Sequence, residues 1–83
     1  KAERREKGDK ARKEKRERLN KYYELELEVA YTIALNPKTN VEQALLKWDE
    51  IEEIKKHMLQ DGYDRAEIEQ INREAYREAK RYP

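Results

Sequence analysis

Every large apolar side chain in this sequence lies after residue 18, so the N-terminal segment has nothing with which to build a core. In residues 1–18 the apolar residues are Ala2 and Ala11, and ten Lys or Arg accompany five Asp or Glu. In residues 19–83 the other ten basic residues accompany fourteen acidic ones, so the overall charge of +1 conceals two unlike parts. We predict a charged basic helical arm, residues 1–18, joined to a folded body, residues 19–83.

A body of this size buries only roughly 60% of the surface that its unfolded chain exposes, which leaves no room for a large enclosed active site. The absence of cysteine excludes disulfides, thiolate nucleophiles and cysteine-bound zinc. The apolar stretches are far shorter than the roughly 20 residues that span a bilayer. We therefore expect a soluble, intracellular and cytoplasmic protein without a cofactor. The chain begins with Lys1 rather than Met, which suggests processing or trimming of a longer product.

The arm is rich in acid-before-base pairs at i,i+4 spacing, each of which adds about 0.2–0.5 kcal/mol to an isolated helix. Such pairs allow a helix to form without burying apolar surface. Gly8 costs about 1 kcal/mol relative to alanine inside a helix. We therefore predict a helix from near Asp9 onward, with a softer start before it. The pairs are Glu3–Lys7, Glu6–Lys10, Asp9–Lys13, Glu14–Arg18 and Glu17–Lys21.

Residues 23–35 are ambiguous because an apolar residue occupies every second position from Tyr23 to Leu35. Strict alternation is typical of a strand, but no other segment alternates comparably, so a strand here has to pair between two chains. The same residues also fit a helix that is apolar over most of its circumference and lies between two neighbours. We favour a helix from Asp9 to Leu35. Its main face holds Leu19, Tyr23, Leu27, Ala30, Tyr31 and Ala34, and a second face holds Tyr22, Leu25, Val29 and Ile33.

If residues 23–35 form a strand instead, the order strand, helix, turn, helix resembles that of ribbon–helix–helix repressors. In those proteins two chains pair their strands and lay them in the major groove of DNA. The apolar side chains of such a ribbon face the core, so Glu24, Glu26 and Glu28 would face the bases and phosphates. DNA repels acidic groups there, which makes the ribbon the weaker alternative.

A second helix follows the first after a short break. Asn36-Pro37 ends the first helix, because the residue before proline is disfavoured in the α region. Thr39 or Asn40 caps the second helix, and Gly62 ends it as a left-handed cap. We expect Trp48 to be the central packing residue of its apolar face. That face holds Val41, Ala44, Leu45, Trp48, Ile51, Met58 and Leu59, with Ile54 at its edge.

The third helix opens with the clearest local signal in the chain. Asp64 followed by Glu67 forms a capping box, and Tyr63 is placed to pack on Ile68. The fold class that follows is all-α: a long N-terminal helix whose charged first half projects, and a C-terminal helical hairpin that completes a small three-helix bundle. The expected apolar stripe of the third helix is Ile68, Ile71, Ala75, Ala79 and Tyr82.

Surplus apolar and tyrosine residues point to a partner surface. Four of the six tyrosines exceed what a core of this size buries: Tyr22, Tyr31, Tyr76 and Tyr82. Tyrosine is favoured at interfaces that are dry on one side and wet on the other. An exposed apolar patch usually marks a partner or a self-association surface. The candidate partner-binding residues are Tyr22, Leu25, Val29, Tyr31 and Leu46.

The basic arm admits three interpretations. Its cations can neutralise phosphates, with Tyr22 and Tyr23 stacking on bases, although the interleaved acids would repel the same phosphates. The arm can instead dock on an acidic protein surface, or serve as a solvated spacer or the stump of a longer coiled coil. The candidate contact residues are Arg4, Arg5, Lys10, Arg12, Lys13 and Arg16.

Catalytic and metal chemistry find no support in the sequence. His57 is the only histidine, and the carboxylates Asp49, Glu50, Glu52 and Glu53 splay around a helix rather than converge. There is no serine nucleophile, and two isolated glycines build no phosphate loop. We therefore expect no enzyme and no metal site.

The most economical function is a non-catalytic protein–protein interaction module of an accessory, regulatory or assembly protein. It would bind a partner or itself through the Tyr/Leu-rich surface of the first helix and the charged arm. The alternative is a nucleic-acid-binding accessory protein that uses residues 1–18. We expect neither a membrane nor a small-molecule substrate as its ligand.

Overall fold

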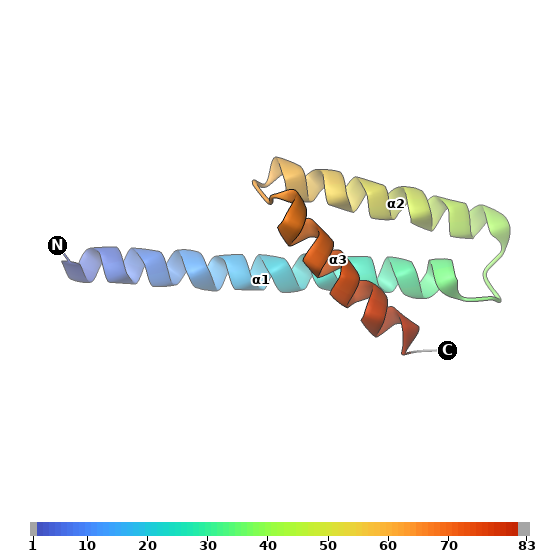
Figure 1. Ribbon diagram of the computed structural model, residues 1–83, viewed down its shortest axis with the longest axis horizontal. Coiled ribbons are helices and arrows are strands. Elements are labelled where there is room, and N and C mark those ends of the chain that lie inside the picture. Colours follow the sequence, from blue (N-terminus) through green and yellow to red (C-terminus); the bar gives the residue numbers. More distant parts are fainter. Residues whose placement is uncertain (1, 82–83) are drawn as a thin grey trace.

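The computed structural model describes the backbone of residues 2–81 and the side chains of residues 10–81. Three helices and no strand occur in this part of the chain: α1 (Ala2–Leu35), α2 (Val41–Gln60) and α3 (Arg65–Lys80). α2 runs back alongside the C-terminal half of α1, and α3 crosses α1 obliquely (Figure 1). The predicted all-α, three-helix architecture is confirmed, and the ribbon alternative is wrong because residues 23–35 are helical.

α1 begins at Ala2, further toward the N-terminus than the predicted start near Asp9. The prediction placed the start too late because it treated Gly8 as a weak point, whereas a cost of about 1 kcal/mol inside a helix does not end the helix there. The N-terminal half of α1 projects beyond both other helices (Figure 1), which gives the molecule an elongated envelope of 57 × 24 × 17 Å. α1 ends before Pro37, as predicted.

The helix ends follow the local signals in the sequence. The side chain of Asn40 accepts a hydrogen bond of 2.8 Å from the backbone N–H of Gln43 and caps α2. Gly62 has a φ of 90°, the left-handed conformation that favours glycine. Asp64 and Glu67 accept each other's backbone N–H in a capping box at the start of α3. All three predicted caps are confirmed.

The core lies where α1 meets α2 and α3. Leu27, Ile51 and Met58 are fully buried at its centre. α1 packs extensively against both other helices, whereas α2 and α3 contact each other much less. The predicted main face of the long helix is confirmed as the face that enters the core. The core residues are Tyr23, Leu27, Ala30, Tyr31, Ile51, Ile54, Met58, Tyr63, Ile68, Ile71, Ala75 and Ala79.

The predicted apolar face of α2 is wrong in part. Trp48 is 39% exposed rather than central, and Ile54 is buried rather than at the edge. The reason is that α2 packs mainly against α1, so most of its side toward α3 stays open. Tyr82, the last residue of the predicted stripe of α3, lies outside the described residues. The other members of the α2 face that remain exposed are Val41, Leu45 and Leu59.

Candidate partner-binding surfaces

A groove of about 370 Å³ lies between α1 and α2. Tyr22, Leu25 and Val29 line its α1 side, where the i,i+3,i+7 spacing places them on one stripe. Each of the three side chains is more than half exposed. The structure therefore brings together three of the five predicted partner-binding residues. The other residues that line this α1–α2 groove are Glu26, Ala30, Lys47, Glu50 and Ile54.

The remaining two predicted partner-binding residues lie elsewhere. Leu46 is exposed on α2 but does not line the α1–α2 groove. Tyr31 is only 4% exposed, so its assignment to the exposed surface is wrong. Its ring meets those of Trp48 and Tyr76 edge to face, at centroid distances of 5.6 and 5.3 Å. Its hydroxyl donates a hydrogen bond of 2.5 Å to Oδ1 of Asn72, which satisfies the polar end inside the bundle.

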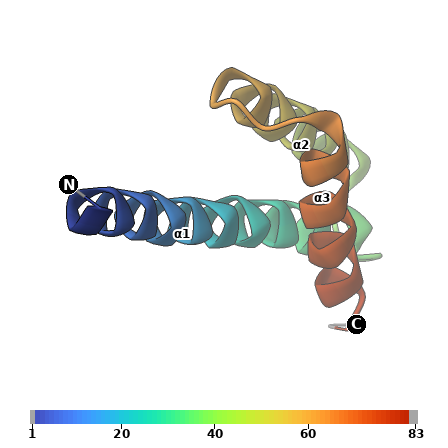
Figure 2. The ribbon, with the colours of Figure 1, turned by 60° about the vertical axis from the view of Figure 1, so that its left-hand side comes forward.

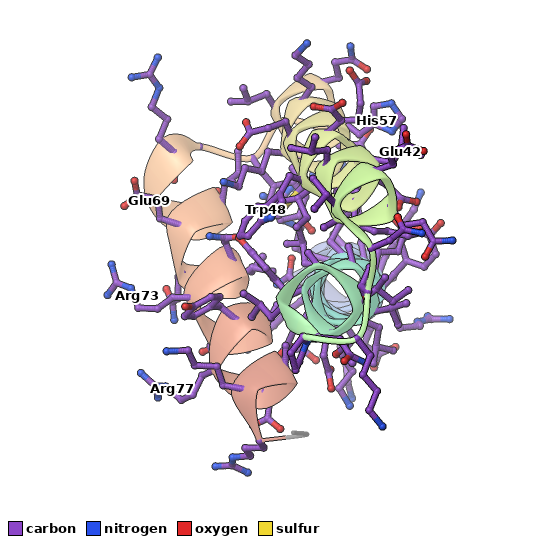
Figure 3. The ribbon with its side chains drawn as sticks, turned by 90° about the vertical axis from the view of Figure 1, so that its right-hand side faces the viewer. Glu42, Trp48, His57, Glu69, Arg73 and Arg77 are labelled. Atoms are coloured by element: carbon purple, nitrogen blue, oxygen red, sulfur yellow. The ribbon has the colours of Figure 1, made fainter. Side chains whose placement is uncertain are left out.

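A larger groove, of about 720 Å³, lies between α2 and α3. Tyr31, Trp48 and Tyr76 contribute an aromatic cluster to its lining, and Figure 3 shows Trp48 between the two helices. This groove was not predicted from the sequence, because Trp48 was expected in the core. The available signal was the breadth of the apolar face of α2, which exceeds what one neighbouring helix covers. The rest of its lining is Glu52, Lys55, Lys56, Leu59, Arg65, Ile68, Glu69, Asn72 and Arg73.

Polar contacts tie the base of the arm to the turn between α2 and α3. Arg16 donates a hydrogen bond of 3.0 Å from Nη2 to Oε2 of Glu67, and its guanidinium lies 3.7 Å from the ring centroid of Tyr63. The Tyr63 hydroxyl donates to Oδ1 of Asn20. Arg16, predicted as a contact residue of the arm, is thus engaged within the fold.

The Tyr23 hydroxyl donates to Oδ2 of Asp61 in the same region. Burial, this hydrogen bond and the Asp61 charge raise the pKa of Tyr23 from its ordinary value of 10.0 to about 12. Because the pKa is higher in the folded state, the associated stability is complete below pH 10 and disappears as the pH rises through about 12. We expect the free energy of unfolding to fall over this window. Urea titrations of the wild type and Tyr23→Phe should show a shallower fall for the variant, and identical profiles would contradict the assignment.

The other predicted arm residues differ in what the structure describes. Lys10, Arg12 and Lys13 are exposed on the part of α1 that projects from the bundle (Figure 2). The side chains of Arg4 and Arg5 lie outside the described side chains. Lys10, Arg12 and Lys13 are thus exposed, whereas Arg16 is partly buried and paired with Glu67.

Acidic side chains of α1 and α3 surround Glu24. Glu24 of α1 lies near Glu74 and Glu78 of α3, and burial together with these charges and Glu28 raises the pKa of Glu24. His57 lies on the outer side of α2, away from α3, in Figure 3. Among the residues that the structure describes, no group of three or more histidine or carboxylate side chains is placed to hold a metal ion.

None of the described helices combines the length and the apolar character required to cross a membrane. The chain matches no protein-family model, and comparisons with curated proteins and with solved structures give no significant match. The geometry and chemistry of the two grooves and the arm are therefore the basis for a functional proposal.

Proposed function

We propose that the chain is a non-catalytic protein–protein interaction module, an accessory or assembly protein that binds its partner through the α1–α2 groove. The observation that carries the proposal is the exposed stripe Tyr22, Leu25 and Val29. Single exposed apolar side chains are common on soluble proteins, but three aligned ones beside a groove are typical of a binding site. Burial of one such side chain contributes about 1.5–3 kcal/mol when it passes from full exposure to full burial.

The arm supplies the second element of the proposal. Lys10, Arg12 and Lys13 are exposed on the same helix that carries the apolar stripe. Exposed charges of this kind mainly accelerate association with an oppositely charged partner and make binding sensitive to salt. We therefore assign specificity and most of the affinity to the groove, and electrostatic attraction to the arm.

Replacement of Leu25 by glutamate tests the proposal. It places a charge on the stripe, so we expect a loss of affinity of at least about 30-fold for the partner, the scale of an interface hot spot. Leu46→Glu is the matched control, because Leu46 is exposed to a similar extent, 65% against 59%, and lies outside the groove. The partner is isolated with the wild type and then titrated against each variant.

Sedimentation equilibrium of the same three proteins shows whether the partner is a second copy of the chain. Circular dichroism confirms that both variants keep their helices. Wild-type affinity in Leu25→Glu, or an equal loss in Leu46→Glu, would contradict the proposed use of the α1–α2 groove.

The second candidate function is nucleic-acid binding by the arm, supported by the exposed Lys10, Arg12 and Lys13. The exposed acids Glu14 and Glu17 share that part of the helix and would repel the same phosphates. This candidate requires binding of a labelled DNA or RNA oligonucleotide that weakens steeply with salt, with a slope of about −0.9 for each neutralised phosphate of duplex DNA. It also requires that charge reversal at Arg12 and Lys13 abolishes that binding.

A further inference from the structure

We infer that the α2–α3 groove is a second docking site, and that its occupant is an amphipathic helix of a partner protein with acidic residues flanking its apolar stripe. This inference goes beyond the proposed function, since the α1–α2 and α2–α3 grooves have no lining residue in common. The shape of the groove, the chemistry of its lining and the charge of its rim support it.

The groove has the shape of the space that a further helix would fill between α2 and α3. α1 packs against both neighbours, while α2 and α3 diverge from the turn that connects them and contact each other little (Figures 1 and 2). In four-helix bundles the space beside two such helices is filled by another helix, packed about 8–10 Å from its neighbours. A groove of about 720 Å³ is available for the side chains of that helix.

The lining of the groove has the composition of an interface centre. Tyr31 supports Trp48 and Tyr76 through edge-to-face contacts, so these rings are held in place before any ligand arrives. Tryptophan and tyrosine are the residues most enriched at interface hot spots. Val41, Leu45 and Trp48 lie at i,i+4,i+7 spacing and so form one exposed apolar row along α2. No other described part of the bundle covers this row. A helix with an apolar stripe matches such a row.

The rim of the groove is basic, and it therefore favours a partner helix whose residues beside the apolar stripe are acidic. Among its charged lining residues, four basic side chains outnumber two acidic ones. Both lysines are paired along α2: Nζ of Lys55 lies 3.5 Å from Oε1 of Glu52, and Nζ of Lys56 lies 3.6 Å from Oε1 of Glu53. Among the described side chains, neither Arg65 nor Arg73 has a carboxylate within 4.0 Å. Free guanidinium groups bind carboxylates in a bidentate manner, so acidic flanking residues complement this rim. The full charged set is Lys55, Lys56, Arg65 and Arg73 with Glu52 and Glu69.

Trp48 is the only tryptophan of the chain, so its fluorescence reports the occupancy of this groove directly. The probes are three tryptophan-free helical peptides that share one leucine stripe and carry glutamate, glutamine or lysine on its flanks. We expect the glutamate peptide to shift the Trp48 emission to shorter wavelength in a saturable manner. Its affinity should exceed that of the lysine peptide by about tenfold or more.

Two double variants test the role of the rim. Arg65→Glu/Arg73→Glu should abolish or reverse the preference for the glutamate peptide. Lys21→Glu/Lys38→Glu makes the same change of charge at residues outside the groove lining and should keep the preference. Leu25→Glu should bind the peptides like the wild type, which separates this site from the α1–α2 groove.

Four results would overturn the inference. The first is that the lysine peptide binds as tightly as the glutamate peptide or more tightly, and the second is that Trp48 responds to no peptide. The third is an emission shift that depends on the concentration of the chain alone. The fourth is an oligonucleotide that shifts the Trp48 emission and binds more tightly than the glutamate peptide. The third result would assign the groove to a second copy of the chain, and the fourth to a nucleic acid.

Discussion

Leu27→Ala is expected to lower the free energy of unfolding by about 2–5 kcal/mol, whereas Leu25→Ala changes it by no more than about 0.5 kcal/mol. The two leucines lie two positions apart on α1 and differ in burial, since Leu27 is fully buried and Leu25 is 59% exposed. Truncation of Leu27 removes apolar contacts and leaves a cavity among the side chains of all three helices. Truncation of Leu25 removes only surface that water already covers.

The expected loss at Leu27 is a large part of the total stability, because domains are stable by only about 5–15 kcal/mol and small ones lie near the lower end. Urea titrations followed by circular dichroism give both free energies of unfolding. Both substitutions replace leucine by alanine in the same helix, so the contribution of helix propensity cancels when the two free energies are compared. Equal effects of the two substitutions would contradict the burial assigned to this face of α1.

Tyr31→Ala is expected to cost about 3–5 kcal/mol, and Tyr31→Phe about 1 kcal/mol. Alanine removes the ring that contacts Trp48 on α2 and Tyr76 on α3, whereas phenylalanine keeps both edge-to-face contacts. Phenylalanine loses only the hydrogen bond to Asn72. The contrast between the two variants separates the packing of the ring from its hydrogen bond.

Unfolding titrations provide the two energies, and the near-ultraviolet circular dichroism of Trp48 provides a local signal. We expect Tyr31→Phe to keep that signal and Tyr31→Ala to lose it, because Trp48 then has no ring against which to pack. If Tyr31→Ala is as stable as the wild type, Tyr31 does not belong to the core.

Local features were predictable from the sequence because short-range interactions determine them. The capping box at Asp64 and the left-handed turn at Gly62 need only residues within one helical turn of each other. The main face of α1 was also predictable, since helical spacing places its members on one side. For Trp48, exposure depends instead on the angle at which α3 crosses α1. That angle is set by packing among residues far apart in the sequence, and no local pattern encodes it.

The two grooves also differ in whether the sequence could predict them. The stripe of Tyr22, Leu25 and Val29 was predictable because those residues fall off the main face of α1. The α2–α3 groove was not, because the side of α2 that it exposes has the same apolar pattern as a side that faces a core. Exposure of that side becomes visible only when α2 and α3 are seen to diverge.

The central position of α1 has a consequence for how the domain folds and unfolds. Hydrogen bonds from Arg16, Tyr23 and Tyr31 reach partners 51, 38 and 41 residues further along the chain. α2 and α3 share few contacts of their own, so the hairpin has no core until α1 is in place, and folding must wait for these long loops to close. The three helices are thus expected to open and close as one cooperative unit. A ligand held by any one of them then slows amide hydrogen exchange throughout the body.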